Sequence, residues 1–432
     1  MKSPYRTHYV GQLNAQMEGK EVVLAGWVHE IRDIGKIIFI QLRDHSGIVQ
    51  VTVKMGEASQ ALIEASKLPK ESVISVRGVV KANPQAHAGF EIIPKEIRNI
   101  NPLASMIPFE VTGKVPAEID VRLDYRHIDL RRLETTAVFN VVSTVLGSFR
   151  KIVSKEGFQE IRTPGIVEEA TEGGTDLFQL QYFEKKAYLA QSPQLYKQLA
   201  VIGGMDRVFM IMPVYRAEKH NTIYHLNEST QMDIEMGFAT PDDAIMLLKK
   251  VVVGILKDVA KANAQDLKTL DAQFVMPKPR VITYKQALSK LNANGIKMEF
   301  GEDFTREHEA RLCELYGELL VVKEYPTAVR AFYSMPNEKD PEVSNSYDLI
   351  YKGIEISSGA QRIHDPAILV DAIRKRGLDE NAFSFYINAF KQGAPPHAGW
   401  SIGAERFAMK ITNRQNIREC ALFPRDRDRV RP

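Results

Sequence analysis

Five short runs of strand-forming residues lie within the first hundred positions, and their spacing limits the fold more than any other feature of the chain. Gly, Pro and polar residues separate the runs, as at residues 44–47 and at Asn83 and Pro84, which is typical of turns between strands. A helix-sized segment, residues 57–66, interrupts the series. The runs cover residues 22–24, 36–42, 48–53, 72–79 and 90–93. Five short strands this close together predict a small closed barrel.

This barrel should be one of at least two domains, because 432 residues exceed what one hydrophobic core usually supports. A five-stranded barrel of this size is of the OB type, which commonly binds oligonucleotides, and we assign it residues 1–104. Residues 105–130 contain Pro108, Gly113 and Pro116 without sustained periodicity, which indicates a hinge. We assign the remainder, residues 131–432, to a second domain in which strands alternate with helices of varied length.

An apolar stripe near the start of the second domain predicts a long amphipathic helix. Its members recur at three- and four-residue intervals, and Gly157 is placed to end the helix. The stripe consists of Val138, Val141, Val142, Val145, Phe149, Ile152 and Val153. The periodicity favours a helix that faces the core, and a helix at a dimer contact is the alternative. Strands are predicted further along, at residues 188–190, 208–213, 232–238, 349–356 and 401–403.

Composition and cysteine content exclude several classes of protein. The two cysteines, Cys313 and Cys420, lie far apart, which excludes a disulfide framework and a CxxC zinc site and suits a reducing cytoplasm. No apolar stretch approaches the roughly 18 residues of a membrane span, and the first residues do not resemble a signal peptide. We therefore expect a cytoplasmic protein that does not bind membranes. The net charge of +3 neither indicates nor excludes a nucleic-acid partner.

The sequence contains no glycine-rich phosphate loop. It contains three other short motifs instead. Pro164 follows a strand-like segment, residues 158–162, and Arg216 and Glu218 form an Arg-x-Glu pair after another predicted strand. Residues 403–406 read Gly-Ala-Glu-Arg. In this order the three resemble motifs one, two and three of the class II aminoacyl-tRNA synthetases. A more specific resemblance, to the archaeal and eukaryotic type of aspartyl-tRNA synthetase, lies in residues 171–178, 191–197, 355–359 and 423–426.

The resemblance covers nearly the whole chain and implies an α+β fold. An N-terminal OB-fold β-barrel that binds the anticodon would be followed by a class II synthetase catalytic domain, built on an antiparallel sheet flanked by helices. The implied activity is that of an aspartate–tRNA ligase with L-aspartate, ATP and tRNA(Asp) as substrates, and tRNA(Asn) as a further candidate. The resemblance also implies a homodimer that pairs through residues 135–155 and the strand with Pro164.

For ATP, the resemblance assigns residues whose chemistry suits phosphoryl transfer. Arg216 would neutralise charge on the α-phosphate during attack, although a lone arginine is also typical of a surface salt bridge. Glu218 would read the adenine amino group, and His225 and Arg406 would meet the β- and γ-phosphates, a task that suits the planar fork of arginine. Arg216 and Arg406 are therefore the candidate catalytic residues.

Glu355 and Ser358 are the candidate ligands of Mg²⁺, the cofactor expected with ATP. Hard oxygen donors suit a magnesium ion that bridges phosphates, and Glu355 is counted with the ATP-binding residues as well. The two residues should lie one helical turn or two strand steps apart. A lone glutamate is usually structural, but its place within the matching residues 354–359 favours the metal role.

The resemblance places the side-chain carboxylate of aspartate between Arg362 and Lys197. Two cations facing one anion would explain selectivity, because a neutral amide there would leave a charge buried and unpaired. Residues 171–178, with two glycines, suit a loop that closes over the substrate. The other aspartate-binding candidates, which receive the α-ammonium group or orient the pocket, are Glu172, Ser192, Gln194, Asp233 and Ser358.

In the barrel, Phe39, Gln50 and Glu91 resemble the residues that grip the middle anticodon base. An aromatic ring can stack on a splayed base while polar groups read its edge. Phe39 taken alone, however, fits the barrel core best. His29 and His87 stand where relatives strictly specific for tRNA(Asp) tend to carry tryptophan and lysine, which suggests relaxed reading of the anticodon.

Three departures from the family pattern and three alternative functions remain. Tyr224 precedes His225 where family members often carry arginine, and Ala360 and Ala398 replace expected glycines. The nearest alternative is an asparaginyl-tRNA synthetase, against which Lys197 argues. The others are an amino-acid ligase of synthetase descent, such as an asparagine synthetase, and an RNA-binding module with a degenerate catalytic domain.

Overall fold

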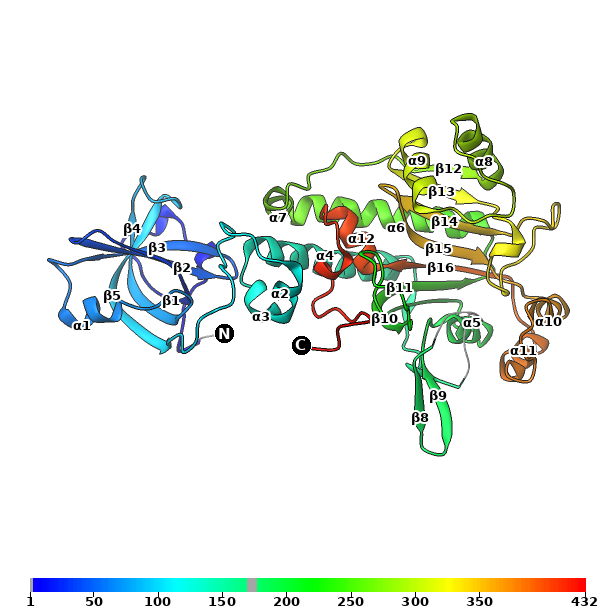
Figure 1. Ribbon diagram of the computed structural model, residues 1–432, viewed down its shortest axis with the longest axis horizontal. Helices are drawn as coiled ribbons and strands as arrows, with labels where there is room; N and C mark the ends of the chain where they lie inside the picture. The colour runs from blue at the N-terminus through cyan, green and yellow to red at the C-terminus, as the bar shows by residue number, and fades with distance from the viewer. Residues whose placement is uncertain (1–2, 169–176) are drawn as a thin grey trace. The chain divides into compact units, whose positions relative to one another are not determined.

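The computed structural model describes residues 3–168 and 177–432 and divides into two compact units, Met1–Thr136 and Ala137–Pro432 (Figure 1). Each unit has its own hydrophobic cluster. No helix in these described ranges is both long and apolar enough to cross a membrane.

The first unit contains the expected five-stranded closed barrel. The strands follow one another around it in the order β1-β2-β3-β5-β4, and the short helix α1 (Gln60–Ala65) lies between β3 and β4 in sequence. The bounds are β1 (Glu21–Asp33), β2 (Ile37–Asp44), β3 (Gly47–Lys54), β4 (Val73–Ala82) and β5 (Phe90–Asn101). The prediction of an OB-type barrel is confirmed, with most strands longer than their apolar runs.

Alternation along β2 shows which side chains fill the barrel. Ile38, Ile40 and Leu42 are buried in its core, whereas Phe39 and Gln41 between them are only partly buried. Successive side chains of a strand point to opposite faces, so Phe39 lies on the outer face. The expectation that Phe39 taken alone belongs to the core is therefore wrong, because its neighbours on both sides occupy the inward positions.

The segment that follows β5 belongs to the first unit. It includes the short helices α2 (Ile119–Asp124) and α3 (Arg126–Asp129). Just beyond α3, Arg131 lies 3.0 Å from the carboxylate of Glu71 and stacks 5.3 Å from the ring of Trp27. These contacts attach the segment to the barrel.

The second unit is built on an eight-stranded sheet in the order β12-β13-β14-β15-β16-β11-β10-β6. Its pairs are antiparallel except at the two edges, where β12 pairs with β13 and β10 with β6 in parallel. This confirms the predicted antiparallel α+β architecture. The bounds are β6 (Gln159–Glu160), β10 (Arg207–Tyr215), β11 (Glu228–Gly237), β12 (Arg280–Thr283), β13 (Leu319–Lys323), β14 (Ser346–Tyr351), β15 (Ile354–Gln361) and β16 (His397–Gly403).

One face of this sheet packs on two long helices, α4 (Leu133–Lys155) and α6 (Pro241–Ala262). The apolar stripe of α4 is buried in the main core, as the periodicity predicted, and Gly157 follows the helix with φ of +82°. On β11, Met232 and Ile234 point into the same core. The intervening side chains of β11 therefore face the opposite side of the sheet.

Shorter helices surround the sheet, and a small sheet lies between its strands β6 and β10 in sequence. In Figure 1, α8 (Tyr284–Ala293) and α9 (Arg306–Tyr316) lie near the β12 edge, and α10 (Pro366–Lys375) lies beside α11 (Ser384–Lys391). The remaining helices are α5 (Gln194–Ile202), α7 (Ala264–Thr269) and α12 (Ala404–Ile411). The small sheet consists of β7 (Ile166–Val167), β8 (Gln179–Tyr182) and β9 (Lys185–Leu189).

The single strand predicted over residues 349–356 is wrong, because the chain reverses within it. β14 ends at Tyr351 and β15 begins at Ile354. The turn residues Lys352 and Gly353 both have positive φ, +47° and +76°, which suits a tight hairpin turn. Apolar residues on both sides of the turn concealed the reversal.

Candidate active site

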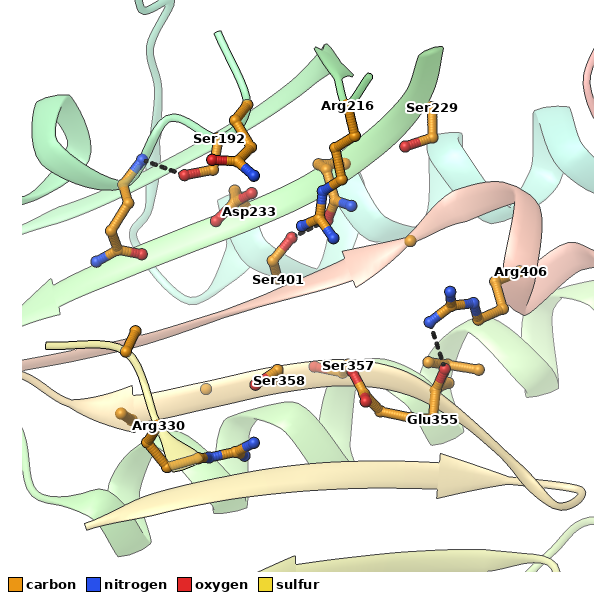
Figure 2. A pocket seen from close by; sticks show the side chains of 18 of the residues that line it. Ser192, Arg216, Ser229, Asp233, Arg330, Glu355, Ser357, Ser358, Ser401 and Arg406 are labelled. Atoms are coloured by element: carbon orange, nitrogen blue, oxygen red, sulfur yellow. Dashed lines mark hydrogen bonds between the residues drawn. The ribbon is translucent and has the colours of Figure 1, made fainter. Parts of the chain in front are cut away.

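A pocket of about 460 Å³ opens on the sheet face opposite the main core. Figure 2 shows Arg216, Asp233 and Ser401 on one side and Glu355 and Ser358 on the other. The structure brings together in its lining Ser192, Gln194, Lys197, Arg216, Glu218, His225, Asp233, Glu355, Ser358, Arg362 and Arg406. Among the predicted catalytic-domain residues, Glu172 is the exception, and it lies outside the described residues.

Arg216 directly follows β10 and enters the pocket with its guanidinium available. Its backbone is held by Asn227, whose carbonyl oxygen accepts from Arg216 N at 2.9 Å and whose side-chain amide donates to Arg216 O at 2.9 Å. The same amide donates to the carbonyl oxygen of Glu218 at 3.3 Å. Within the described chain, Nε of Arg216 is buried without a hydrogen-bond partner. A cation placed in this way is ready for an anionic ligand.

His225 lies in the loop after Arg216, on the pocket wall. Its Nδ1 is 2.6 Å from Oγ1 of Thr222, which orients the ring. Burial is the main cause that lowers the pKa of His225; Glu218 opposes this, while Arg406 and Arg216 lower the pKa further. The imidazole is therefore neutral at pH 7, and it contributes a hydrogen bond instead of a charge.

A β-bulge brings Glu355 and Ser358 to the same pocket. β14 pairs Ile350 with Glu355 but Leu349 with Ser357, so β15 has one extra residue at this point. Residues three positions apart normally face opposite sides of a strand, and the bulge shifts this alternation by one. Glu355 and Ser358 were expected two strand steps apart. They are three residues apart, and the bulge between them lets both line the same pocket.

Buried acids surround Glu355, and motif reading did not find them. Burial, followed by the charge of Asp348, raises the pKa of Glu355 to about 7. Burial likewise raises the pKa of Glu309 to about 7, and the Glu309 carboxylate accepts a hydrogen bond from Glu355 N at 3.1 Å. Arg330, which lines the pocket, pairs with Asp348. Arg406 donates to the backbone oxygen of Glu355 at 3.2 Å (Figure 2).

At another part of the pocket, two cations and two carboxylates form a buried cluster. Nζ of Lys197 lies 2.5 Å from Asp233 Oδ1 and 3.3 Å from Glu235 Oε2. Arg362 donates to the two oxygens of Glu235 from Nε at 3.0 Å and from Nη2 at 3.1 Å. The two cations expected to face one substrate anion thus each hold a carboxylate of the chain as well. Glu235 lies two residues after Asp233 on the same face of β11, and the sequence analysis assigned it no role.

Burial alone would raise the pKa of Glu235, but the charges of Arg362 and Lys197 outweigh burial and hold it below its usual value. Close packing leaves little space around the carboxylate of Glu235. A Cβ atom at Gly399 would lie 2.2 Å from Oε2 of Glu235. Gly399 thus allows the strand β16 to pass beside this carboxylate.

The first residues of α5 complete the pocket. Gln194 N donates to Oγ of Ser192 at 3.3 Å, and Nε2 of Gln194 donates to Oε1 of Gln198 at 2.8 Å. With its amide nitrogen engaged, Gln194 has its oxygen left to accept a hydrogen bond from a ligand. Ala360 and Ala398, which replace expected glycines, are buried in adjacent strands.

A second pocket, of about 240 Å³, opens on the barrel surface. Phe39 and Gln50 line it, and Glu91 lies beside them because it pairs with Gln50 across β3 and β5. Nε2 of Gln50 donates to Oε2 of Glu91 at 3.0 Å. The structure thus brings the three predicted anticodon residues together. His29 and His87 do not line this pocket; His87 is exposed in the turn before β5.

His29 instead joins a buried ion-pair cluster. Its Nδ1 lies 2.6 Å from Nη1 of Arg43, whose Nη2 is 2.8 Å from Glu71. A guanidinium can only donate, so Nδ1 of His29 accepts and the ring proton lies on Nε2. Burial, with the charge of Arg43, lowers the pKa of His29. The ring is neutral at pH 7 and presents one N–H donor.

Comparison with known proteins finds two family models that together match most of the chain. Residues 118–427 match the family described as tRNA synthetases class II (D, K and N), and residues 22–100 match the OB-fold nucleic acid binding domain. The chain is 47% identical over 430 residues to an aspartate–tRNA(Asp/Asn) ligase of Methanocaldococcus jannaschii, covering 99% of this chain and 98% of the relative.

Solved structures of the same kind superimpose over almost all of the chain. The asparaginyl-tRNA synthetase of Pyrococcus horikoshii in complex with asparaginyl-adenylate has a TM-score of 0.94 at 31% identity, with 98% of this chain and 99% of that one covered. The aspartyl tRNA synthetase of Entamoeba histolytica has a TM-score of 0.89 at 31% identity, with 100% and 94% covered.

Proposed function

Because the chain belongs to the class II tRNA synthetases of the D, K and N group, we propose that it activates L-aspartate with ATP and transfers the aspartyl group to tRNA. It is thus an aspartate–tRNA ligase. The observation that carries the choice of amino acid is the buried cluster of Lys197 and Arg362 with Asp233 and Glu235 at the pocket.

The charges of this cluster suit free aspartate, which brings one ammonium and two carboxylate groups. Asp233 can accept the α-ammonium, together with the amide oxygen of Gln194. The side-chain carboxylate can then meet Lys197 and the remaining N–H groups of Arg362, whose Nε and Nη2 are held by Glu235. A guanidinium held in one orientation presents N–H donors that both oxygens of a carboxylate can accept, whereas the NH2 group of a neutral amide cannot accept them, so the site favours a carboxylate.

In the first step, an α-carboxylate oxygen of aspartate attacks the α-phosphorus of ATP. The bond from that phosphorus to the bridging oxygen breaks, and pyrophosphate leaves with the electron pair. Arg216, whose buried Nε has no partner among the described residues, would stabilise the charge that develops on the α-phosphate. Glu218 would accept from the adenine amino group, and His225 and Arg406 would hold the outer phosphates.

In the second step, a ribose hydroxyl of the terminal adenosine of tRNA attacks the carbonyl carbon of aspartyl-adenylate. The carbon–oxygen bond to the phosphate breaks, and AMP leaves. Neither step needs a protein nucleophile, since positioning and charge neutralisation supply the rate enhancement.

The acidic site around Glu355 fits a divalent cation. Glu355 is partly buried, and burial together with the charge of Asp348 raises its pKa to about 7, so a cation there would favour the charged form. In the described part of the chain, no three acidic, histidine or cysteine side chains form a metal site by themselves. Magnesium commonly takes one or two protein oxygens plus substrate phosphates, so Glu355 and Ser358 would hold Mg²⁺ together with ATP. The ion would supply positive charge that neutralises the phosphates.

Asparagine activation is the alternative that a structural likeness favours, since the P. horikoshii asparaginyl enzyme superimposes closely. The rates of pyrophosphate exchange into ATP, measured with aspartate and with asparagine, decide between the two activities. We expect exchange with aspartate and little with asparagine, because Lys197 and Arg362 are charged. Exchange that is faster with asparagine would overturn the proposal.

We propose further that the barrel accepts the anticodons of both tRNA(Asp) and tRNA(Asn). These anticodons differ at one outer base, which is cytosine in one and uracil in the other. The N–H donor of neutral His29 can meet the O2 atom that both pyrimidines carry, so it offers no means of telling them apart. The exposed position of His87 likewise supplies no fixed contact within the barrel pocket. The M. jannaschii relative is named for both tRNAs.

We also keep two expectations as proposals. The chain would form a homodimer through the exposed side of α4 and the segment with Pro164, which is exposed beside Ile166, 47% exposed. A monomer in sedimentation at micromolar concentration would remove this proposal and leave the catalytic one. The free thiols of Cys313 and Cys420 suit a cytoplasmic location.

A further inference from the structure

Arg306, the first residue of α9, stacks on the ring of Tyr224, which lines the active-site pocket. Its guanidinium carbon lies 4.7 Å from the ring centroid. We propose that Arg306 is a phosphate-binding residue of the ATP site, and that it supplies from α9 the guanidinium that Tyr224 leaves out of the loop before His225. This inference rests on the proposed use of ATP and adds a residue outside the three motifs.

Hydrogen bonding within the chain leaves Arg306 unsatisfied. Its Nη1 atom is buried and has no hydrogen-bond partner in residues 3–168 and 177–432. The nearest carboxylate oxygen, Oε2 of Glu309, is 3.6 Å away, which is an ion pair but too long for a hydrogen bond. The same Glu309 oxygen already accepts from Glu355 N at 3.1 Å. A buried N–H group without a partner is rare, and it is most simply explained by a ligand.

The position of Arg306 in its helix gives an independent reason to expect such a role. α9 begins with a capping box in which Thr305 and His308 satisfy one another's backbone groups. The other charged residues of the first turn, Glu307 and Glu309, are acidic, as the positive end of a helix dipole prefers. A cation at the first helical position is disfavoured by this dipole, so the dipole gives no reason for an arginine there.

The charge of Arg306 reaches the residues assigned to the outer phosphates of ATP. Burial is the main cause that lowers the pKa of both His225 and Arg406, and Arg306 lowers both further. Arg306 is therefore within electrostatic range of these two side chains. Several cations gathered near one another in this way are usual where a polyphosphate binds, and they repel each other without it.

Stacking on the ring of Tyr224 suits Arg306 to the binding of phosphate. A guanidinium that lies over an aromatic face keeps its N–H groups free at its edge, where they can form a planar fork with phosphate oxygens. The side chain of Arg306 is 37% exposed, so its edge can meet a ligand that enters from solvent. Tyr224 would thus position the arginine that replaces the one commonly found in the loop.

The experiment compares the binding of ATP and AMP, in the presence of Mg²⁺, by titration calorimetry on the full chain. AMP shares the adenosine and α-phosphate and lacks the outer phosphates. We expect Arg306→Met to weaken ATP binding by about ten- to a hundredfold and AMP binding by less than about threefold. The control is Arg311→Met on the same helix, since Arg311 is exposed and pairs with Glu314 at 2.6 Å. This control should change neither affinity.

The double variant Tyr224→Arg with Arg306→Met tests the replacement itself, since an arginine in the loop should restore part of the ATP affinity. Unchanged ATP binding in Arg306→Met, or equal weakening of ATP and AMP, would overturn the proposal and leave Arg306 as the partner of Glu309. Thermal unfolding of each variant separates loss of fold from loss of a contact. Because binding is measured without aspartate, failure of this inference is distinct from absence of aspartate-dependent exchange in the wild type.

Discussion

Arg362 donates two parallel hydrogen bonds to the carboxylate of Glu235, from Nε at 3.0 Å and from Nη2 at 3.1 Å. Both side chains are almost fully buried, 4% and 0% exposed. The pair therefore serves two purposes: it keeps a buried carboxylate satisfied, and it holds the guanidinium in one orientation for the substrate. The predictions that follow separate these purposes.

Replacing Arg362 with leucine should abolish aspartate activation and leave ATP binding largely intact. Glu235 would keep only Lys197 nearby, so the variant should also lose about 3–5 kcal/mol of unfolding free energy. The double variant Arg362→Leu with Glu235→Leu should recover much of the stability and none of the activity. Urea unfolding and pyrophosphate exchange measure the two effects. Normal exchange in the single variant would contradict the assignment of Arg362 to aspartate.

Lys197→Met should raise the KM for aspartate and weaken discrimination against asparagine. Lys197 lines the pocket and shares the carboxylate of Glu235 with Arg362, so its loss removes a positive charge from the place where we put the substrate carboxylate. The measurement is the ratio of kcat/KM for exchange with aspartate and with asparagine. If the ratio is the same as in the wild type, Lys197 does not read the amino-acid side chain.

Glu235 should also make stability depend on pH in the acidic range. Its pKa in the folded chain is below the usual 4.5, because Arg362 and Lys197 outweigh the effect of burial. A lowered carboxylate pKa contributes stability above the unfolded value, and this contribution is lost as pH falls through the folded pKa. The difference in unfolding free energy between wild type and Glu235→Gln should therefore shrink below about pH 4.5. A difference that does not change with pH would contradict this ionisation.

Phe39→Ala should weaken charging of tRNA without affecting the activation step. The ring lies on the outer face of β2 and lines the barrel pocket, so its removal takes away a stacking surface worth about 1–3 kcal/mol. The KM for tRNA should rise, and pyrophosphate exchange should stay at the wild-type rate. Ile100→Ala, another partly exposed apolar residue of the barrel unit, is a control. Equal effects of the two variants would remove Phe39 from the anticodon site.

The sequence predicted those parts of the site whose residues belong to contiguous motifs. Arg216, Glu218 and Arg406 meet in the pocket because the first two closely follow β10 and the third lies in the first turn of α12, directly after β16 of the same sheet. The alternation of β11 likewise places Asp233 and the missed Glu235 on one face. Motif order therefore carried more information than composition, which left the function open.

Other parts depend on register and on loops, which no periodicity encodes. The hairpin at Lys352 and Gly353 divides an apolar run that reads as one strand, and the pairing of β14 with β15 decides where the bulge falls. Arg330 reaches the pocket from a loop, and Arg306 contacts the pocket residue Tyr224 from a helix about 90 residues after Arg216. Their spacing in the sequence gives no sign that they meet.

The most direct test of the proposed function is aspartylation of purified tRNA(Asp) and tRNA(Asn) transcripts by one preparation of the protein. Since His29 offers one N–H donor that cytosine and uracil accept alike, we predict that both transcripts are charged, with values of kcat/KM within about tenfold of each other. A ratio above about a hundredfold would contradict relaxed reading of the anticodon, and failure to charge either transcript with aspartate would contradict the function itself.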